Sequence, residues 1–456
     1  NSNHVHSKKP CLVESDHNNV TDLKTKEGNN NSSLSQSGVV DSEYFNAQES
    51  LTKKERYRIH YSWENVIDQI DFRSTSKDDW VYETYNLSSE FRKFQKLTIE
   101  QIKKNPILCY KADIQKILSL SNIMLIEHIK PSFLTVTQTI WDQIYQRKLP
   151  PSLAPVVTNI ALEYSSMLNS FTPLNVIQDT WCNNFSKIAG LTDQEDKDKF
   201  CQAQIIFRNF LLLRTKCVNT NNEDTFVHET LHDLLKEIFR DSMFELIWAN
   251  SESLVSKNQR SNSSSNKENL RGEKPDFKIV ANTKEEILFG EVKTKDSSSL
   301  LVNKDFVKLS NFQSSALDEL IKKYGNRSGL TSFGIWICGE WLNLAYLFNA
   351  FINMLWIAFI GARICIYEMD INHDGIYRMF LMANVVTPTE QAQFLCLIPV
   401  LEALYNVKDH INKVLKVIAS DTSSDTSSSS SRSTYTRIPI PSPKLIKIAI
   451  IGSKSN

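Results

Sequence analysis

The sequence predicts an α/β domain over residues 216–420, with an all-α accessory region before it and a disordered tail at each end. Apolar residues recur at steps of three and four through residues 50–215, whereas helical and strand patterns alternate after residue 216. The chain has 456 residues, of which 41% are hydrophobic and 23% charged, as in a globular protein of two or three domains. Only 12 Gly and 13 Pro are present, which disfavours a β-sandwich rich in tight turns.

The two ends of the chain have the composition of disordered segments. Residues 1–48 consist mainly of Asn, Ser, Lys and Asp and cannot bury enough apolar surface to offset chain entropy. Residues 421–456 begin with a Ser/Thr/Asp run and form a Ser-rich tail. No apolar stretch of signal-peptide type opens the chain, and the eight cysteines include no CxxC pair, so we expect an intracellular protein with reduced thiols. The basic run at 53–58 is interpreted as a solvated helix start, with a nuclear-import patch as the alternative.

The accessory region, residues 50–215, is predicted to be a set of short helices. Phe91, Phe94 and Ile102 belong to one helical stripe, and prolines at 106, 131, 150, 151, 155 and 173 separate such stripes. The region contains no motif with a chemical mechanism. Trp141 and Trp181 are interpreted as core residues rather than as a surface for base stacking.

Helices and strands alternate in residues 216–420. An amphipathic helix is expected at 229–240, a strand at 244–249 and a polar loop at 256–273. A hairpin follows, with strands at 277–280 and 286–293 and a turn at 282–284. The remaining predictions are a helix at 305–324, strands at 332–338, 363–369 and 376–386, and a helix at 390–419 bent at Pro399.

The hairpin contains residue types that suit a divalent cation. Mg²⁺ prefers oxygen ligands and commonly takes one or two carboxylates from the protein, which Asp276 and Glu291 can supply. Adjacent antiparallel strands bring side chains on one face within about 5 Å of each other. Glu291 and Lys293 share a face because side chains alternate along a strand, while Val292 points into the opposite layer. Lys293 would then lie beside the cation, where it could orient or deprotonate a water or stabilise phosphate charge.

An Asp followed by ExK also arises by chance, and an exposed charged hairpin is the simplest alternative. The context supports the chemical interpretation. Asp276 follows Pro275 at the start of an apolar strand, Glu291 ends the apolar run 287–290, and an amphipathic helix comes next.

Residues 270–295, 303–339 and 363–382 together resemble a fungal group of PD-(D/E)XK nuclease-like proteins related to the nuclease-type domains of Crinkler effectors. The resemblance covers roughly residues 216–420, including the helix and strands after the motif. It implies a restriction-endonuclease-like fold with a mixed central sheet flanked by helices. It also implies that Asp276, Glu291 and Lys293 take the catalytic positions, with Asp276 and Glu291 as ligands of Mg²⁺ or Mn²⁺.

The resembling folds usually add an acid on the first helix of the core. Glu223 is the preferred match, and Glu229 is the alternative. Lys308 and Gln313, on the helix after the motif, are expected either to face the site or to lie on the surface.

One apolar segment does not fit this fold. Residues 341–361 contain no charge and are long enough to span a bilayer, but the strands on either side of them should lie in one sheet. The resembling family joins these strands almost directly. We therefore favour a retained intron at 340–361, since residues 339–341 can be encoded by GGTGAGTGG, which contains a splice-donor consensus. A membrane helix and a buried insert are the alternatives.

The chain has no general positive charge that would favour binding to phosphate backbones. Lys and Arg total 52, as do Asp and Glu, so any contact with nucleic acid must be local. The first hypothesis is a metal-dependent hydrolase of phosphodiester bonds, with DNA as the expected substrate. The second is a catalytically weak nuclease-fold module that binds nucleic acid or a protein partner. The third is an effector or selfish-element component in which the helical region acts as the targeting part.

Overall fold

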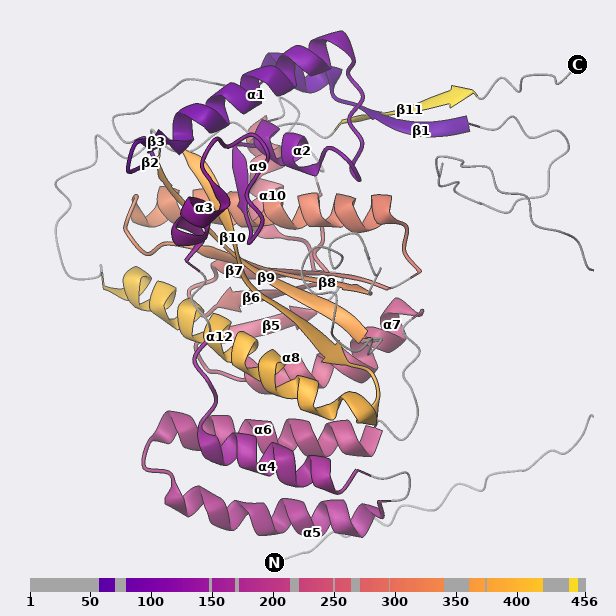
Figure 1. Ribbon diagram of the computed structural model, residues 1–456, viewed down its shortest axis with the longest axis vertical. Helices are drawn as coiled ribbons and strands as arrows, with labels where there is room; N and C mark the ends of the chain where they lie inside the picture. The colour runs from indigo at the N-terminus through magenta and orange to yellow at the C-terminus, as the bar shows by residue number, and fades with distance from the viewer. Residues whose placement is uncertain are drawn as a thin grey trace, which may run out of the picture. The chain divides into compact units, whose positions relative to one another are not determined.

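The computed structural model describes part of the chain, all of it within Ser50–Asn456 (Figure 1). The described residues are 57–69, 79–146, 150–168, 172–213, 221–248, 251–263, 271–294, 296–339, 361–373, 375–420 and 443–449. The expected disorder of residues 1–48 lies outside them. So do the apolar residues 340–360 and most of the tail after residue 420.

A mixed sheet of seven strands forms the centre of the fold, as the sequence led us to expect. Its order is β4-β10-β9-β8-β7-β6-β5. The strands are β4 (Ile123–Ile126), β5 (Phe244–Trp248), β6 (Phe277–Ala281), β7 (Glu286–Lys293), β8 (Ser332–Gly339), β9 (Gly361–His373) and β10 (Ile376–Pro388). The pairs β7–β8 and β4–β10 are parallel, and the other four neighbours are antiparallel.

Helices cover both faces of the sheet (Figure 1). On one face lies α10 (Ser299–Tyr324), the crossover that joins the parallel strands β7 and β8. Its Phe312 stacks on Phe289 of β7, with ring centroids 5.2 Å apart. On the other face lies α12 (Leu397–Ala419), where His410 contacts Phe333 of β8. The sheet therefore presents two differently covered faces, and the motif residues belong to the face under α10.

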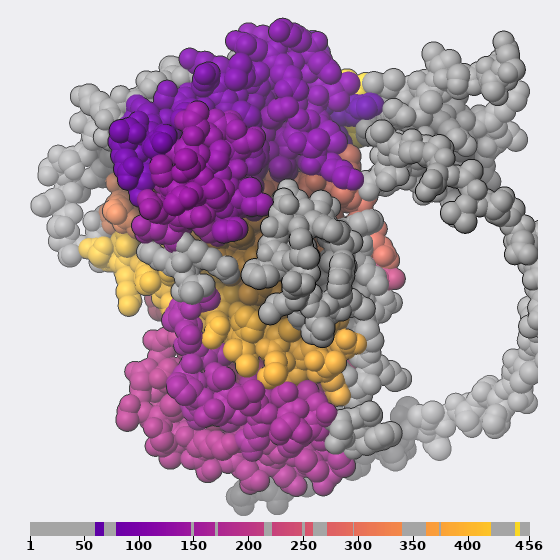
Figure 2. Space-filling view, in the orientation of Figure 1, coloured from indigo at the N-terminus to yellow at the C-terminus, as the bar shows by residue number. Residues whose placement is uncertain are grey.

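The helices before residue 216 divide between the two faces. Figure 1 shows α1 and α2 beyond α10, α3 near β10, and α4, α5 and α6 beyond α12; in Figure 2 the residues before about 146 and those of α4, α5 and α6 gather at opposite ends of the view. Their bounds are α1 Leu87–Lys104, α2 Ile114–Leu120, α3 Gln138–Tyr145, α4 Pro155–Ser166, α5 Leu174–Asn184 and α6 Gln194–Leu213. Trp141 of α3 is fully buried, which confirms its core role, while Trp181 of α5 is partly buried and packs edge-on against Phe185.

The prediction that residues 50–215 are all-α is wrong. The region contains β1 (Tyr57–Ser62), which pairs with β11 (Lys444–Ala449), the ribbon of β2 (Val81–Tyr82) and β3 (Tyr85–Asn86), and β4. β4 is a run of four buried apolar residues, a pattern that periodicity alone cannot assign to helix or strand. Its pairing with Tyr377–Phe380 of β10 places it at one edge of the sheet.

Most of the elements predicted after residue 216 are present, with different ends. The hairpin of β6 and β7 is confirmed. A continuous helical run replaces the helix expected at 229–240: α7 (Glu223–Phe226), a π-helical turn (Val227–Leu231) and α8 (His232–Ile238). The 256–273 segment is not wholly a loop, because it contains most of α9 (Leu254–Ser263). Short 3-10 helices lie at Glu64–Gln69, Phe185–Gly190 and Gln391–Cys396.

Two side chains explain differences between prediction and structure. Glu286 of β7 accepts hydrogen bonds from the backbone N–H groups of Leu254 and Val255, which caps α9 and makes it a helix. Pro399 does not bend a helix midway, because α12 begins at Leu397. A proline in the first turn removes an N–H group that has no partner within the helix.

The strands that flank the apolar segment lie side by side. β8 and β9 pair in antiparallel register as far as Gly339 and Ala362. Among the helices that the structure describes, none is long and apolar enough to cross a membrane.

Candidate active site

Asp276 lies at the open end of the β6–β7 hairpin, directly before β6. Its N–H donates to the Gly290 carbonyl oxygen at 3.0 Å, and its Oδ2 accepts from the Val292 N–H at 2.7 Å. Gly290 is required for this arrangement because a Cβ atom there would lie 2.1 Å from the Phe277 ring. The carboxyl of Asp276 is therefore fixed by backbone pairing beside Glu291.

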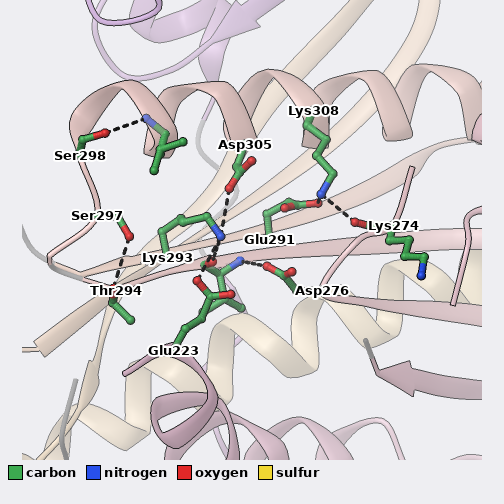
Figure 3. A network of polar contacts seen from close by, with 12 residues as sticks. Glu223, Lys274, Asp276, Glu291, Lys293, Thr294, Ser297, Ser298, Asp305 and Lys308 are labelled. Carbon is green, nitrogen blue, oxygen red and sulfur yellow. Dashed lines mark hydrogen bonds and ion pairs between the residues drawn. The ribbon is translucent and has the colours of Figure 1, made fainter. Parts of the chain in front are cut away.

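Glu291 and Lys293 face α10, while Val292 is fully buried in the opposite core layer. This alternation confirms the predicted arrangement of the triplet. The Glu291 side chain is only 1% exposed, and its Oε1 lies 2.7 Å from Nζ of Lys308. The contact is an ion pair between a buried carboxyl and a partly exposed lysine. Figure 3 shows the lysine reaching down from α10 to the acid.

Lys293 lies among several oxygen atoms (Figure 3). Its Nζ is 3.1 Å from Oε2 of Glu223, 3.1 Å from Oδ2 of Asp305 and 2.9 Å from the carbonyl oxygen of Val292. The Lys293 side chain is 17% exposed. Acids on two different helices therefore hold this ammonium beside the strand.

The structure brings Glu223, and not Glu229, to the motif. Glu223 is the first residue of α7, where the side chain of Asn222 caps the helix by accepting from the Thr225 N–H at 2.9 Å. Glu229 lies in the π-helical turn and, with Asp233, lines a separate small cavity between α6 and α8. Of the two candidates, Glu223 is therefore the one in contact with the motif.

The predictions for residues on α10 were only partly right. The sequence analysis missed Asp305, although its spacing of three from Lys308 places both on one helix face. Lys308 faces the site. Gln313 neither faces the site nor lies on the surface. Gln313 is fully buried, and its Nε2 donates to the carbonyl oxygens of Ser332 and Tyr367, both at 3.3 Å.

The surroundings of the site change the pKa values of its acids and of Lys293. Burial, followed by repulsion from Asp276, raises the pKa of Glu291 from 4.5 to about 9. Burial also raises the pKa of Asp276 and of Glu223, although Lys293 opposes both shifts. Burial would lower the pKa of Lys293, but the carboxylates of Asp305, Asp276 and Glu223 raise it. Lys293 therefore keeps its positive charge, whereas burial and Asp276 favour the protonated form of Glu291 and Lys308 opposes them.

Asp276 and Glu291 fit the two-carboxylate contribution that Mg²⁺ or Mn²⁺ takes from a protein. A cation between the acids would relieve the repulsion of Asp276 on the buried Glu291 carboxyl. Across the described ranges, no group of three or more His, Cys, Asp and Glu side chains is arranged to hold a metal. Any remaining ligands would be water or substrate oxygens.

Comparisons of the chain with protein-family models, with curated proteins and with solved structures found no match.

Proposed function

We propose that this protein hydrolyses phosphodiester bonds of nucleic acid, with DNA as the expected substrate, at a PD-(D/E)XK-type site that uses Mg²⁺ or Mn²⁺. The observation that carries the proposal is the position of Asp276, Glu291 and Lys293 on one face of a hairpin, with Glu223 in contact with Lys293. The mixed sheet with α10 between two parallel strands supports a restriction-endonuclease-like fold. The proposed relationship to Crinkler-type nuclease domains depends on the sequence resemblance alone.

Each side chain has a role in this proposal. A divalent cation held by Asp276 and Glu291 would polarise the phosphate and lower the pKa of an attacking water. Lys293 stays charged, so it stabilises negative charge on the phosphate and does not accept the proton of the water. Glu223 and Asp305 hold the ammonium in place.

The test is cleavage of labelled single- and double-stranded DNA and RNA by the full chain in Mg²⁺, Mn²⁺ or EDTA. We expect metal-dependent cutting that Asp276→Asn and Lys293→Met each reduce by a factor of about 10² or more. Glu319→Gln is the control, because Glu319 lies on α10 and forms an ion pair with Lys322 at 3.8 Å near the surface. Folded protein that cuts none of these substrates in any metal contradicts the proposal.

The second candidate is a nuclease-fold module that binds nucleic acid or a protein partner without cutting it. It is favoured by the pairing of both site lysines with carboxylates, which leaves them less free to assist cleavage. Binding of the same labelled substrates, without cutting and unaffected by Asp276→Asn, would support this candidate.

A further inference from the structure

Lys308 is placed differently from Lys293, although both contact acids of the site. Its Nζ lies 2.7 Å from the Glu291 Oε1 and 2.7 Å from the Lys274 carbonyl oxygen. The Glu291 side chain is 1% exposed, whereas the Lys308 side chain is 25% exposed. Lys308 thus reaches from the surface of α10 to a carboxylate that solvent does not reach.

The contact is the main compensation for the buried Glu291 carboxylate. Asp276 repels this carboxylate, whereas the Lys308 Nζ lies 2.7 Å from its Oε1. A buried carboxylate needs a cation nearby, and here the ammonium supplies one. The same oxygen is the one that a divalent cation would need.

We propose that the Lys308 ammonium occupies the cation position on Glu291 in the metal-free protein and is displaced when a divalent cation binds. The inference rests on the proposed function, which assigns Glu291 as a metal ligand. A divalent ion within about 2.1 Å of Oε1 and an ammonium 2.7 Å from the same oxygen would repel each other strongly.

Lys308 can make this movement and Lys293 cannot. The flexible stem of Lys308 leads to solvent, and its second contact is a single backbone carbonyl near the surface. Lys293 is held by two carboxylates and is 17% exposed. Only Lys308 therefore competes with the metal, and its competition weakens metal binding.

The first test measures Mn²⁺ binding to the full chain by titration calorimetry, without substrate. We expect Lys308→Gln to bind Mn²⁺ at least about tenfold more tightly than the unmodified chain, because a nearby positive charge has been removed. Lys304→Gln is the matched control: it lies one turn earlier on α10, is exposed and sits over the Tyr61 ring. We expect it to change Mn²⁺ affinity by less than about threefold, because solvent screens an exposed charge.

The second test needs no variant, so it does not depend on Lys308→Gln folding normally. Saturating Mn²⁺ should raise acylation of Lys308 by an amine-reactive ester severalfold, read by mass spectrometry, with Lys304 as the internal reference. Equal Mn²⁺ affinity in all three proteins, or unchanged Lys308 acylation in Mn²⁺-saturated protein, overturns the displacement and leaves the proposed function standing. No Mn²⁺ binding by any of the three proteins overturns the metal-dependent function and the displacement together.

Discussion

Glu291 combines near-complete burial with a neighbouring acid, and this makes the stability of the metal-free protein depend on pH. The pKa of Glu291 rises from 4.5 in the unfolded chain to about 9 in the folded protein, so the folded state binds the proton more tightly. Its contribution to stability is fully present below about pH 4.5 and is lost as the pH rises through 9.

We therefore expect the unfolding free energy in EDTA to fall between pH 6 and pH 8, by at most about 1.4 kcal/mol per pH unit for one proton. Urea unfolding measured at each pH checks this. Glu291→Gln should flatten the profile because its amide does not titrate, and Mg²⁺ should stabilise the unmodified chain more at pH 8 than at pH 6. The same slope in Glu291→Gln would assign the titration to another group.

Asp305 is expected to act as a positioning residue through Lys293. Asp305→Asn should lower kcat about 10- to 100-fold with little change in KM, the loss expected for one charged hydrogen bond. The pKa of Lys293 should also fall, since Asp305 is the carboxylate that raises it most, so activity should decline at a lower alkaline pH. Asp305→Glu should restore part of kcat and part of the activity at alkaline pH. A kcat loss without a shift of the pH profile would point to a structural role.

The difference between Asp276 and Asp305 shows what the sequence can predict about the site. Asp276, Glu291 and Lys293 lie on one hairpin, where the two-residue period alone decides which side chains share a face. Asp305 and Lys308 reach the site only because α10 packs on β7 with one particular stripe. Several stripes of this helix contain charged residues, so sequence spacing does not identify which stripe meets the acids.

At the scale of the elements, the pairing of β8 with β9 sets how far apart the two ends of the apolar segment lie. A straight helix of 21 residues would place its ends about 31 Å apart, whereas Gly339 and Ala362 are paired neighbours. Paired residues of antiparallel strands lie about 5 Å apart.

Replacing residues 340–360 with one Asn would create a two-residue Asn-Gly turn with the native Gly361, the preferred connection for a tight hairpin. We expect the sheet to form as before and the unfolding free energy to rise by about 2 kcal/mol through the shorter loop. Urea unfolding checks the change, and a loss of folded protein would show that the segment is required. Sequencing of the transcript tests the retained-intron hypothesis separately.

At the scale of the molecule, the sheet includes a strand from outside the predicted α/β domain. β4 covers the edge of β10, and Tyr145 of α3 donates to the Leu381 carbonyl oxygen at 2.8 Å. A second core joins Ile376 of β10 to residues of this N-terminal part, among them Trp80, Phe91 and Trp141. Local periodicity assigned the type of most elements correctly, but it contains no information on pairing across so long a stretch of chain.

A fragment of residues 216–420 should consequently self-associate, because it exposes the β10 edge and the apolar residues that α1 and α3 cover. A fragment of residues 57–449, which keeps β4 and the β1–β11 pair, should remain monomeric. Size-exclusion chromatography with light scattering distinguishes the two, and a stable monomeric 216–420 fragment would contradict the expectation.

The β4–β10 pairing also affects how the protein is made. β4 pairs at Ile123 with Tyr377, which the ribosome adds 254 residues later. At roughly 5–20 residues per second, the apolar strand waits about 13–50 s for its partner. Nascent chains of this protein therefore carry an unpaired apolar strand through most of translation, and their yield should depend on chaperones that bind such segments.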